Sequence, residues 1–176
     1  GNTYDNITIN KPAGIAASTT NANNLSITSN CTVFTGILSI GNGGTAVGQV
    51  AENVFSGNPA SSILEVKDGA GLRILGTSLF PASFPTSWLN VILNPNSDCD
   101  YAAVGSQAIV AHQYGNLMST ATGGTRTLAS SGNIKIAGVF SPNTPTILYT
   151  ITGSTVEYNG VLAQTISPFN YNNLTT

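Results

Sequence analysis

Apolar and polar residues alternate in short runs along most of the chain, and Gly, Asn and Ser separate one run from the next. A period of two residues over such a length, bounded by turn-forming residues, is typical of half-buried β-strands. We therefore predict an all-β protein in which nearly every strand is three to six residues long. The predicted strands lie within residues 7–9, 25–27, 33–34, 37–40, 63–66, 72–75, 91–93, 134–136, 147–151 and 155–158.

Residues 46–55 depart from this alternation. Val47, Val50, Ala51, Val54 and Phe55 follow the i, i+3, i+4, i+7, i+8 spacing of an amphipathic helix, which occurs nowhere else in the chain. We expect a short helix here, or a loop that caps part of the structure, within an insertion near residues 46–60.

A second departure lies at residues 79–88, where Pro81 and Pro85 exclude a central strand because proline cannot donate to a β-ladder. A loop is therefore predicted. Its aromatic residues Phe80, Phe84 and Trp88 are candidates for contact with a partner, although such side chains more often hold a loop against the core.

An internal repeat organises the C-terminal half of the chain. Residues 154–176 align without a gap on residues 97–119, and eight of the aligned pairs are identical. The identical pairs are Ser97/Ser154, Tyr101/Tyr158, Val104/Val161, Gln107/Gln164, Ile109/Ile166, Tyr114/Tyr171, Asn116/Asn173 and Leu117/Leu174. A partial copy at residues 4–9 opens the chain, where YDNIT is similar to YNNLT at residues 171–175. The two long copies are expected to be equivalent coils.

The alignment also predicts which residues of the repeat face the core. The expected inward residues are Val104, Ile109 and Leu117 in one copy and Val161, Ile166 and Leu174 in the other.

Short strands, polar turns and a long gap-free repeat favour a right-handed parallel β-helix over the alternative, a β-sandwich or jelly roll. If a solenoid coil takes about 20–28 residues, the offset of the repeat is two or three coils, and both copies return to the same face. A sandwich gives no reason for such a repeat, and Asx-Gly hairpin turns are scarce. Residues 1–176 are expected to form a single solenoid domain.

The charge content narrows the possible functions. Only 7% of the residues are charged, against about a quarter in an average soluble domain, whereas the 41% hydrophobic content is ordinary. With five basic and seven acidic side chains and a net charge of −2, the chain has no basic stripe for nucleic acid or anionic lipid. No apolar run approaches the roughly 18 residues of a membrane span. We expect neither nucleic-acid binding nor membrane insertion.

Three segments resemble the repeats of very large secreted surface proteins of the Bacteroidetes phylum. They are GSTVEYNGVLAQTISPFNYNNLT at residues 153–175, GTRTLASSGNIKIAGVF at residues 124–140, and LRILGT at residues 72–77 with Phe80-Pro81. Those proteins repeat a phrase of the form "gsTVeYNG-aQTI-YnNLTi-sG-kTLsG-v-v-G-l". The resemblance covers most of the chain, from Tyr4 to Thr176, with departures at residues 98–103, DCDYAA, and at residues 106–108, SQA.

The resemblance implies export, commonly by the type IX secretion system, and a role as adhesin-like or filamentous material outside the cell or on its surface. It supplies no catalytic residues and no cofactor. The expected partners are neighbouring copies or flanking repeats of the same protein, arranged head to tail, with surface glycans as further candidates.

Few residues are candidates for chemistry. Asp98 and Asp100 flank Cys99 and are weak candidates for calcium ligands, but no third carboxylate lies near them, and an exposed strand face accounts for them better. The single histidine, His112, aligns with Phe169, which argues against a catalytic base. No serine elbow or partner carboxylate accompanies it to build a triad. We assign no catalytic residue and no metal site.

Ten residues are interpreted as structural repeat positions. They are Tyr4, Asn6, Tyr101, Gln107, Tyr114, Asn116, Tyr158, Gln164, Tyr171 and Asn173. In the Tyr-x-Asn phrase we expect the tyrosine ring to face inward and the asparagine amide to pair with the backbone of the next coil. If it were exposed, the same arrangement would be a sugar-binding platform.

The two cysteines, Cys31 and Cys99, are expected to be buried and not bonded to each other. At the coil length given above, they lie about three coils apart. Because stacked strands are separated by about 4.8 Å each, the pair would exceed the roughly 7 Å limit between disulfide Cα atoms.

The sequence therefore favours a non-enzymatic extracellular structural or adhesive module, either a segment of a longer surface protein or a subunit of a head-to-tail fibre. The alternative is a carbohydrate-binding or polysaccharide-cleaving β-helix. Cleavage requires acid and base groups clustered in a groove, and seven carboxylates scattered along the chain do not suggest such a cluster.

Overall fold

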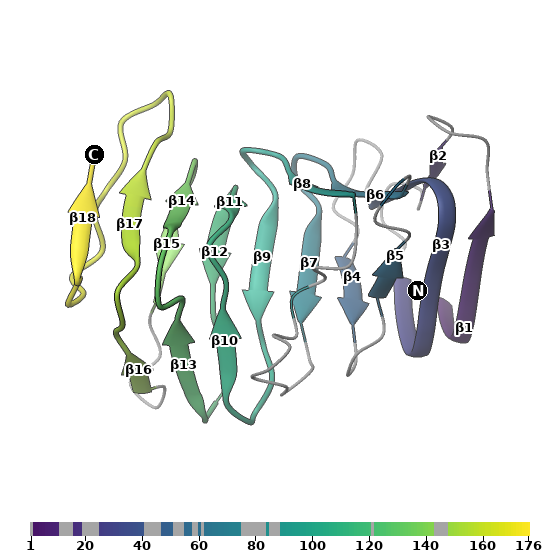
Figure 1. Ribbon diagram of the computed structural model, residues 1–176, viewed down its shortest axis with the longest axis horizontal. Coiled ribbons are helices and arrows are strands. Elements are labelled where there is room, and N and C mark those ends of the chain that lie inside the picture. Colours follow the sequence, from purple (N-terminus) through teal and green to yellow (C-terminus); the bar gives the residue numbers. More distant parts are fainter. Residues whose placement is uncertain are drawn as a thin grey trace.

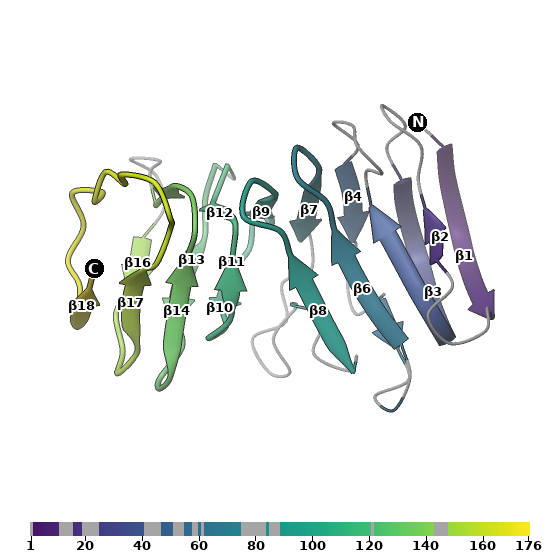
Figure 2. The ribbon, with the colours of Figure 1, turned by 90° about the horizontal axis from the view of Figure 1, so that it is seen from above.

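Every strand pairing in the described part of the chain is parallel, and each strand pairs with strands about one coil before or after it in the sequence. In this computed structural model the strands stack along one long axis from β1 to β18, as Figures 1 and 2 show. The described residues contain no helix. The fold is a parallel β-helix, as the sequence predicts.

The structure describes residues 2–10, 16–18, 25–40, 47–50, 55–57, 60, 62–74, 84, 89–120, 122–142 and 148–176. Side chains are described at residues 60, 63–74 and 84 and in the ranges from residue 89 onward.

The strands form three parallel sheets. The first comprises β1 (Asn2–Asn10), β2 (Ala16–Ser18), β3 (Leu25–Ile40), β4 (Val47–Val50), β5 (Phe55–Gly57), β6 (Ser62–Val66), β7 (Gly71–Ile74), β8 (Asn90–Leu93), β9 (Asp98–Tyr101), β12 (Asn116–Met118) and β15 (Phe140–Ser141). The second comprises β10 (Gln107–Ile109), β13 (Thr125–Leu128) and β16 (Leu148–Thr150). The third comprises β11 (Gln113–Tyr114), β14 (Asn133–Ile136), β17 (Thr155–Tyr158) and β18 (Asn173–Thr175).

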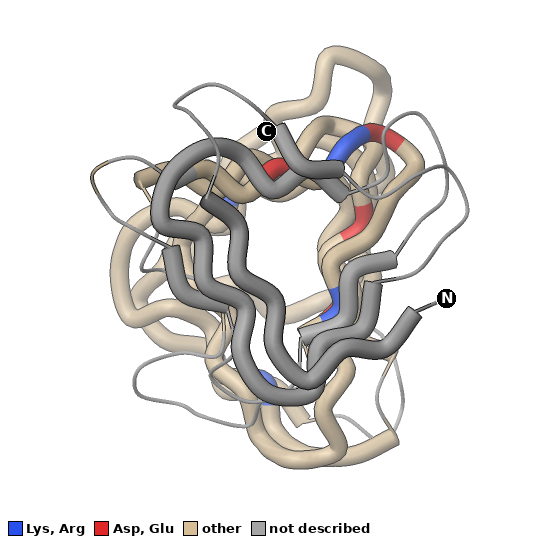
Figure 3. Tube along the Cα trace, turned by 90° about the vertical axis from the view of Figure 1, so that its right-hand side faces the viewer, with Lys and Arg blue, Asp and Glu red and all other residues tan. Residues whose placement is uncertain are grey.

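From β9 onward the chain visits the three sheets in turn, so each coil has three sides. Strands β9, β10 and β11 are followed by β12, β13 and β14 on the same three sheets, and then by β15, β16 and β17. A view along the axis shows the coils superimposed around a common interior (Figure 3). Earlier in the chain, β3 passes from one side to another, because residues 25–35 pair with β1, β4 and β5 and residues 36–40 pair with β2 and β6.

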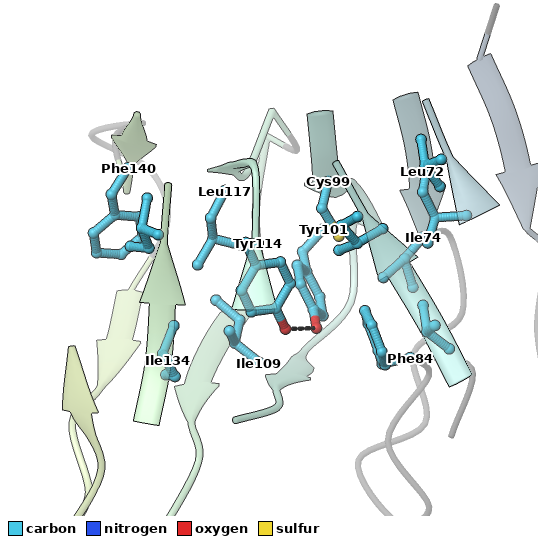
Figure 4. Packing of buried hydrophobic residues seen from close by; sticks show 14 of the residues in the cluster. Leu72, Ile74, Phe84, Cys99, Tyr101, Ile109, Tyr114, Leu117, Ile134 and Phe140 are labelled. Atoms are coloured by element: carbon cyan, nitrogen blue, oxygen red, sulfur yellow. Dashed lines mark hydrogen bonds between the residues drawn. The ribbon is translucent and has the colours of Figure 1, made fainter. Parts of the chain in front are cut away.

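Inward residues form ladders that run along the axis. In the first sheet Leu72, Cys99, Leu117 and Phe140 are consecutive partners, and none is more than 1% exposed. Figure 4 shows these side chains side by side with the aromatic residues of the interior. Each ladder residue is covered by the coils on both sides of it, and apolar burial of this kind contributes roughly 25 cal/mol per Å². The core is therefore continuous from coil to coil.

Several sequence predictions need correction. Residues 47–50 and 55–57 are strands β4 and β5, so the helical spacing of residues 46–55 does not produce a helix there. Strand β4 pairs with β3 and β7 in the first sheet, and the helical spacing results by chance from two short strands that follow each other. Strands β1 and β3 have nine and 16 residues, longer than predicted, because β1 passes through two register shifts and β3 spans two sides.

The offset of the repeat is not a whole number of coils. Strand β9 of the first copy lies in the 11-stranded sheet, whereas β17 of the second copy lies in the four-stranded sheet. The two copies therefore do not return to the same face as predicted. Two full coils lead from β9 through β12 to β15 in the first sheet, and the second copy begins two sides beyond that, after β16.

Two of the predicted inward positions point the wrong way. Ile109 and Leu117 are 1% and 0% exposed, as expected, but Val104 is 71% exposed and its equivalent Val161 is 99% exposed. Both valines lie in the loop after a strand, where an apolar residue carries no information on direction. Ile166 and Leu174 are 42% and 41% exposed because they lie in the last coil, which no further coil covers.

Gly115 is a position at which the close approach of two coils excludes a side chain. A Cβ atom there would lie 2.5 Å from the Ser97 carbonyl oxygen and closer still to that of Asn94. We expect Gly115→Ala to lower the free energy of unfolding by about 1–3 kcal/mol, because backbone atoms of the neighbouring coil cannot move aside. Denaturant unfolding measures this. Gly123→Ala is the control, since its Cβ would meet only the Val104 oxygen at 3.6 Å; equal losses in both variants would contradict the prediction.

Candidate functional site

The repeated phrase builds a closed ring of hydrogen bonds in the core. The Tyr114 hydroxyl donates to the Val110 carbonyl at 2.9 Å, and the Val110 amide donates to the Tyr101 hydroxyl at 3.5 Å. The two hydroxyls are 2.9 Å apart, and because Tyr114 already donates elsewhere, Tyr101 is the donor between them (Figure 4). Both rings are 0% exposed. Two buried hydroxyls are thereby satisfied, and the backbone at Val110 is fixed.

The second copy repeats this ring atom for atom. Tyr171 donates to the Ser167 carbonyl at 2.9 Å, the Ser167 amide donates to the Tyr158 hydroxyl at 3.2 Å, and the two hydroxyls are 2.9 Å apart. Ring centroids of the tyrosine pair are 6.5 Å apart in both copies. Strand β18 also pairs with β17 in the register that β12 keeps with β9, since Leu174 faces Val156 as Leu117 faces Cys99.

A glutamine closes the loop after the first strand of each copy. The Gln107 Oε1 atom accepts the Ala103 amide at 3.2 Å, and its Nε2 donates to Ile74 of the preceding coil at 3.0 Å. Gln164 does the same with the Gly160 amide at 2.7 Å and with Ile136 at 2.9 Å. We call these tyrosine and glutamine residues, with the loops they hold, the tyrosine–glutamine corner. Six of the ten structural repeat positions belong to it.

In the first copy neither tyrosine of the corner is accessible to a ligand, because both are buried. Burial raises the pKa of the Tyr101 and Tyr114 hydroxyls well above their ordinary value, so both stay neutral. In the second copy burial likewise raises the pKa of Tyr171. Because Tyr114 is fully buried, it is not the exposed sugar-binding platform that was considered.

A buried arginine that the sequence analysis missed holds the same loop from the next coil. Arg126 is 0% exposed and donates to three carbonyl oxygens of the loop after β9. Its Nη2 lies 3.0 Å from the Tyr101 oxygen and 2.6 Å from that of Ala103, and its Nη1 lies 2.9 Å from that of Gly105. Its Nε contacts the Ser119 hydroxyl at 3.0 Å. Burial lowers the pKa of Arg126, but a guanidinium stays protonated at neutral pH.

Arg126 lies outside the gap-free repeat, and the resemblance of residues 124–140 gives no indication that its guanidinium is buried. We call the Tyr101, Ala103 and Gly105 carbonyl oxygens, which converge on this guanidinium, the carbonyl cradle.

The asparagine of the repeated phrase pairs as predicted in the first copy. The Asn116 Oδ1 atom accepts the Val139 amide of the next coil at 2.8 Å, and its Nδ2 donates to Asp98 of the preceding coil at 2.8 Å. Asn173, its equivalent, lies exposed in β18. Tyr4 and Asn6 lie in β1, where their backbones face Ile27 and Asn30, and their side chains fall outside the described residues.

Asp98 and Asp100 point away from the interior, and each contacts residues of adjacent coils. Asp100 is only 9% exposed, contrary to the prediction of an exposed strand face, because it accepts hydrogen bonds from the Thr120 amide and hydroxyl and lies 3.5 Å from Arg73. The described residues contain no group of three or more potential metal ligands.

His112 and Phe84 pack together, with Phe84 buried and His112 half-buried beside it. Phe84 is 3% exposed, and its ring centroid lies 4.9 Å from that of His112 and 5.9 Å from that of Tyr114. Phe84 therefore packs against the core and is not exposed to a partner; Phe80, Trp88 and the rest of the predicted loop at residues 79–88 lie outside the described residues. In the second copy Phe169 takes the place of His112, 5.1 Å from Tyr171.

The cysteine prediction is confirmed for Cys99. It is a free, fully buried thiol in the ladder of the first sheet, and burial raises its pKa well above the ordinary value. The Cys31 side chain lies outside the described residues.

One groove of about 630 Å³ lies along the outer surface of the coils. Loops at residues 94–96, 137–139 and 159–165 line it, together with Gln113. Gln113 and Asn159 exchange two amide hydrogen bonds there, at 3.2 and 2.7 Å. The lining contains no charged and no aromatic side chain, so the groove offers neutral amides and small apolar groups.

Comparison of the chain with protein-family models, with curated proteins and with solved structures finds no match. No helix among the described residues has the length and apolar character needed to cross a membrane.

The first site prediction concerns Arg126. We expect Arg126→Met to lower the free energy of unfolding by about 3 kcal/mol or more, because it leaves the carbonyl cradle buried without donors. Arg73→Met is the matched control: the Arg73 side chain is 41% exposed and forms only a 3.5 Å ion pair, so we expect a loss below about 1 kcal/mol. Denaturant unfolding of both variants tests this, and a small loss for Arg126→Met would show that the cradle does not depend on its guanidinium.

The second site prediction concerns pH. Burial lowers the pKa of His112 from 6.5, against a smaller opposing effect of its hydrogen bond to the Val91 carbonyl. The unfolded chain then binds more protons than the folded chain as the pH falls below about 6.5, so the free energy of unfolding decreases there.

His112→Phe, which copies Phe169 of the other repeat, removes this proton uptake. We expect its unfolding free energy to be nearly constant from about pH 7.5 to about pH 5.5, whereas that of the wild type falls, because carboxylates titrate near pH 4. Denaturant unfolding at several pH values measures both, and parallel curves would contradict the assignment.

Proposed function

We propose that the chain is a non-enzymatic structural or adhesive module of an extracellular or cell-surface protein, either a segment of a longer solenoid or a subunit of a head-to-tail fibre. The observation that carries this proposal is how the polar side chains are hydrogen-bonded. The side chains of the tyrosine–glutamine corner, of Asn116 and of Arg126 all form hydrogen bonds to neighbouring residues and coils. They stabilise the stack, and of these side chains only Gln164 lines the groove described above.

The described carboxylates support the non-enzymatic part of the proposal. Each contacts a polar group of the chain: Glu65 pairs with Lys67, Asp68 with the Asn96 amide, Asp98 with Asn116, Asp100 with Thr120 and Glu157 with Asn133. Acid–base cleavage of a glycosidic bond needs two carboxyl groups facing one groove. The groove described above is lined by none.

The β18 end of the stack supports assembly. Strand β18 pairs with β17 on one side only, and Ile166 and Leu174 of the same coil are 42% and 41% exposed. An unpaired parallel edge beside exposed apolar residues is a template for another strand. A contact of this head-to-tail kind does not close on itself, so it produces fibres.

A carbohydrate-binding function is the second candidate, and the groove favours it. Its neutral amides, among them Gln113, Asn159 and Gln164, are suitable partners for sugar hydroxyls. Gln113 and Asn159 already bond to each other, so a sugar would have to compete with that pair.

We expect the 176-residue chain to associate into elongated particles as its concentration rises, because each added subunit covers one open end and leaves another. Sedimentation velocity and electron microscopy test this. A stable compact monomer at high concentration would contradict head-to-tail assembly. Glycan-array binding that Asn159→Ala weakens, in a chain that stays monomeric, would favour the carbohydrate-binding alternative.

A further inference from the structure

The gap-free repeat places a second set of carbonyl-cradle residues in the last coil. In the gap-free alignment of the two copies, the cradle residues Tyr101, Ala103 and Gly105 correspond to Tyr158, Gly160 and Leu162. The loop that carries them is held by equivalent contacts, because Gln107 and Gln164 bond to the middle residue of the three and both tyrosine rings close in the same way. The alignment also keeps a hydroxyl group, because Thr176 aligns with Ser119, whose hydroxyl contacts Arg126 in the first copy.

This second cradle has no guanidinium. No residue in the described part of the chain donates to the carbonyl oxygens of Tyr158, Gly160 or Leu162. Leu162 is 80% exposed, and Val161 beside it is 99% exposed. In the first copy the corresponding oxygens receive donors from Arg126, seven residues after Ser119, in a coil stacked on that copy.

We propose that the carbonyl oxygens of Tyr158, Gly160 and Leu162 form a binding site for the guanidinium of an arginine, carried by a further β-solenoid coil that continues the stack beyond β18. The incoming coil also covers Ile166 and Leu174, as the coil of Arg126 covers Ile109 and Leu117, which are 1% and 0% exposed. The arginine lies seven residues after the position of Thr176. This inference rests on the proposed function, and it names the chemistry by which one coil recognises the next.

The guanidinium comes from a continuing coil and not from the first coil of a second copy of this chain, which can cover the open edge but carries no arginine. The chain has two arginines, Arg73 and Arg126, and none precedes Arg73 in the sequence. The strands at the β1 end of another copy therefore cannot supply a guanidinium. A planar guanidinium also suits three convergent oxygens better than the compact ammonium of lysine, because it presents five N–H donors in a fixed fork.

The experiment uses the chain's own coil as the probe. Residues 120–142, which carry Arg126 and follow the first copy, are duplicated and appended after Thr176 in the full chain. We expect the appended coil to raise the melting temperature by several degrees. We expect the same extended chain with Arg126→Met in the appended segment alone to lose most of that gain, and Arg126→Lys there to recover part of it.

A second measurement reports on the guanidinium itself. In the extended chain, the Nε–H proton of the appended arginine should exchange with solvent as slowly as that of Arg126, and much more slowly than that of Arg73, in an arginine-labelled NMR spectrum. An equal melting temperature for the Arg and Met versions, rapid Nε–H exchange or a disordered appended segment would each overturn the proposal. The extended chain is measured at concentrations where it is monomeric, so a failure of fibre assembly does not affect this outcome.

Discussion

The structure depends on how the backbone is satisfied where the chain turns from one side of a coil to the next. Within the strands the parallel ladders pair the peptide groups, but in the loops that pairing stops, and a buried unpaired carbonyl costs about 1–3 kcal/mol. Side chains of neighbouring coils supply the partners. Gln107 donates a hydrogen bond to the Ile74 carbonyl of the preceding coil, and Asn116 accepts one from the Val139 amide of the next. Arg126 donates to the oxygens of the carbonyl cradle. Each coil is therefore complete only when another is stacked on it.

This constraint explains why the repeated phrase can occur on different sides of the solenoid. The hydrogen bonds that define the tyrosine–glutamine corner join residues within 13 positions of each other, apart from those of the glutamine Nε2 atom to the preceding coil. The phrase thus specifies a local turn of the chain, and its position around the axis is free. Among the described strands, stacked partners are closest in sequence within the two copies, where β9 pairs with β12 and β17 pairs with β18. The partners in β6 and β8 are further apart in sequence. The phrase encodes a tight coil and not a particular face.

Sequence periodicity predicted the fold and much of the core, but not the direction of every apolar residue. Alternation is a property of strands, so Ile109 and Leu117 were placed correctly, whereas Val104 lies in a loop where alternation does not apply. The helical spacing at residues 46–55 was misleading because two short strands can produce it by chance. The tyrosines and glutamines were found because they recur. Arg126 was not found, because its partners are main-chain oxygens, which leave no trace in the sequence.

The scarcity of charge follows from the same stacking. A parallel solenoid places equivalent positions of successive coils about 4.8 Å apart, so like charges in register repel, whereas opposite charges in register attract. Arg73 faces Asp100 in the ladder, and Lys135 faces Glu157. Amides and hydroxyls carry no such restriction, because each can donate to or accept from a copy of itself. A coil built from neutral hydrogen-bonding residues can be stacked on its own repeat without accumulating charge. The buried guanidinium of Arg126 is compatible with this, because neutral carbonyl oxygens surround it.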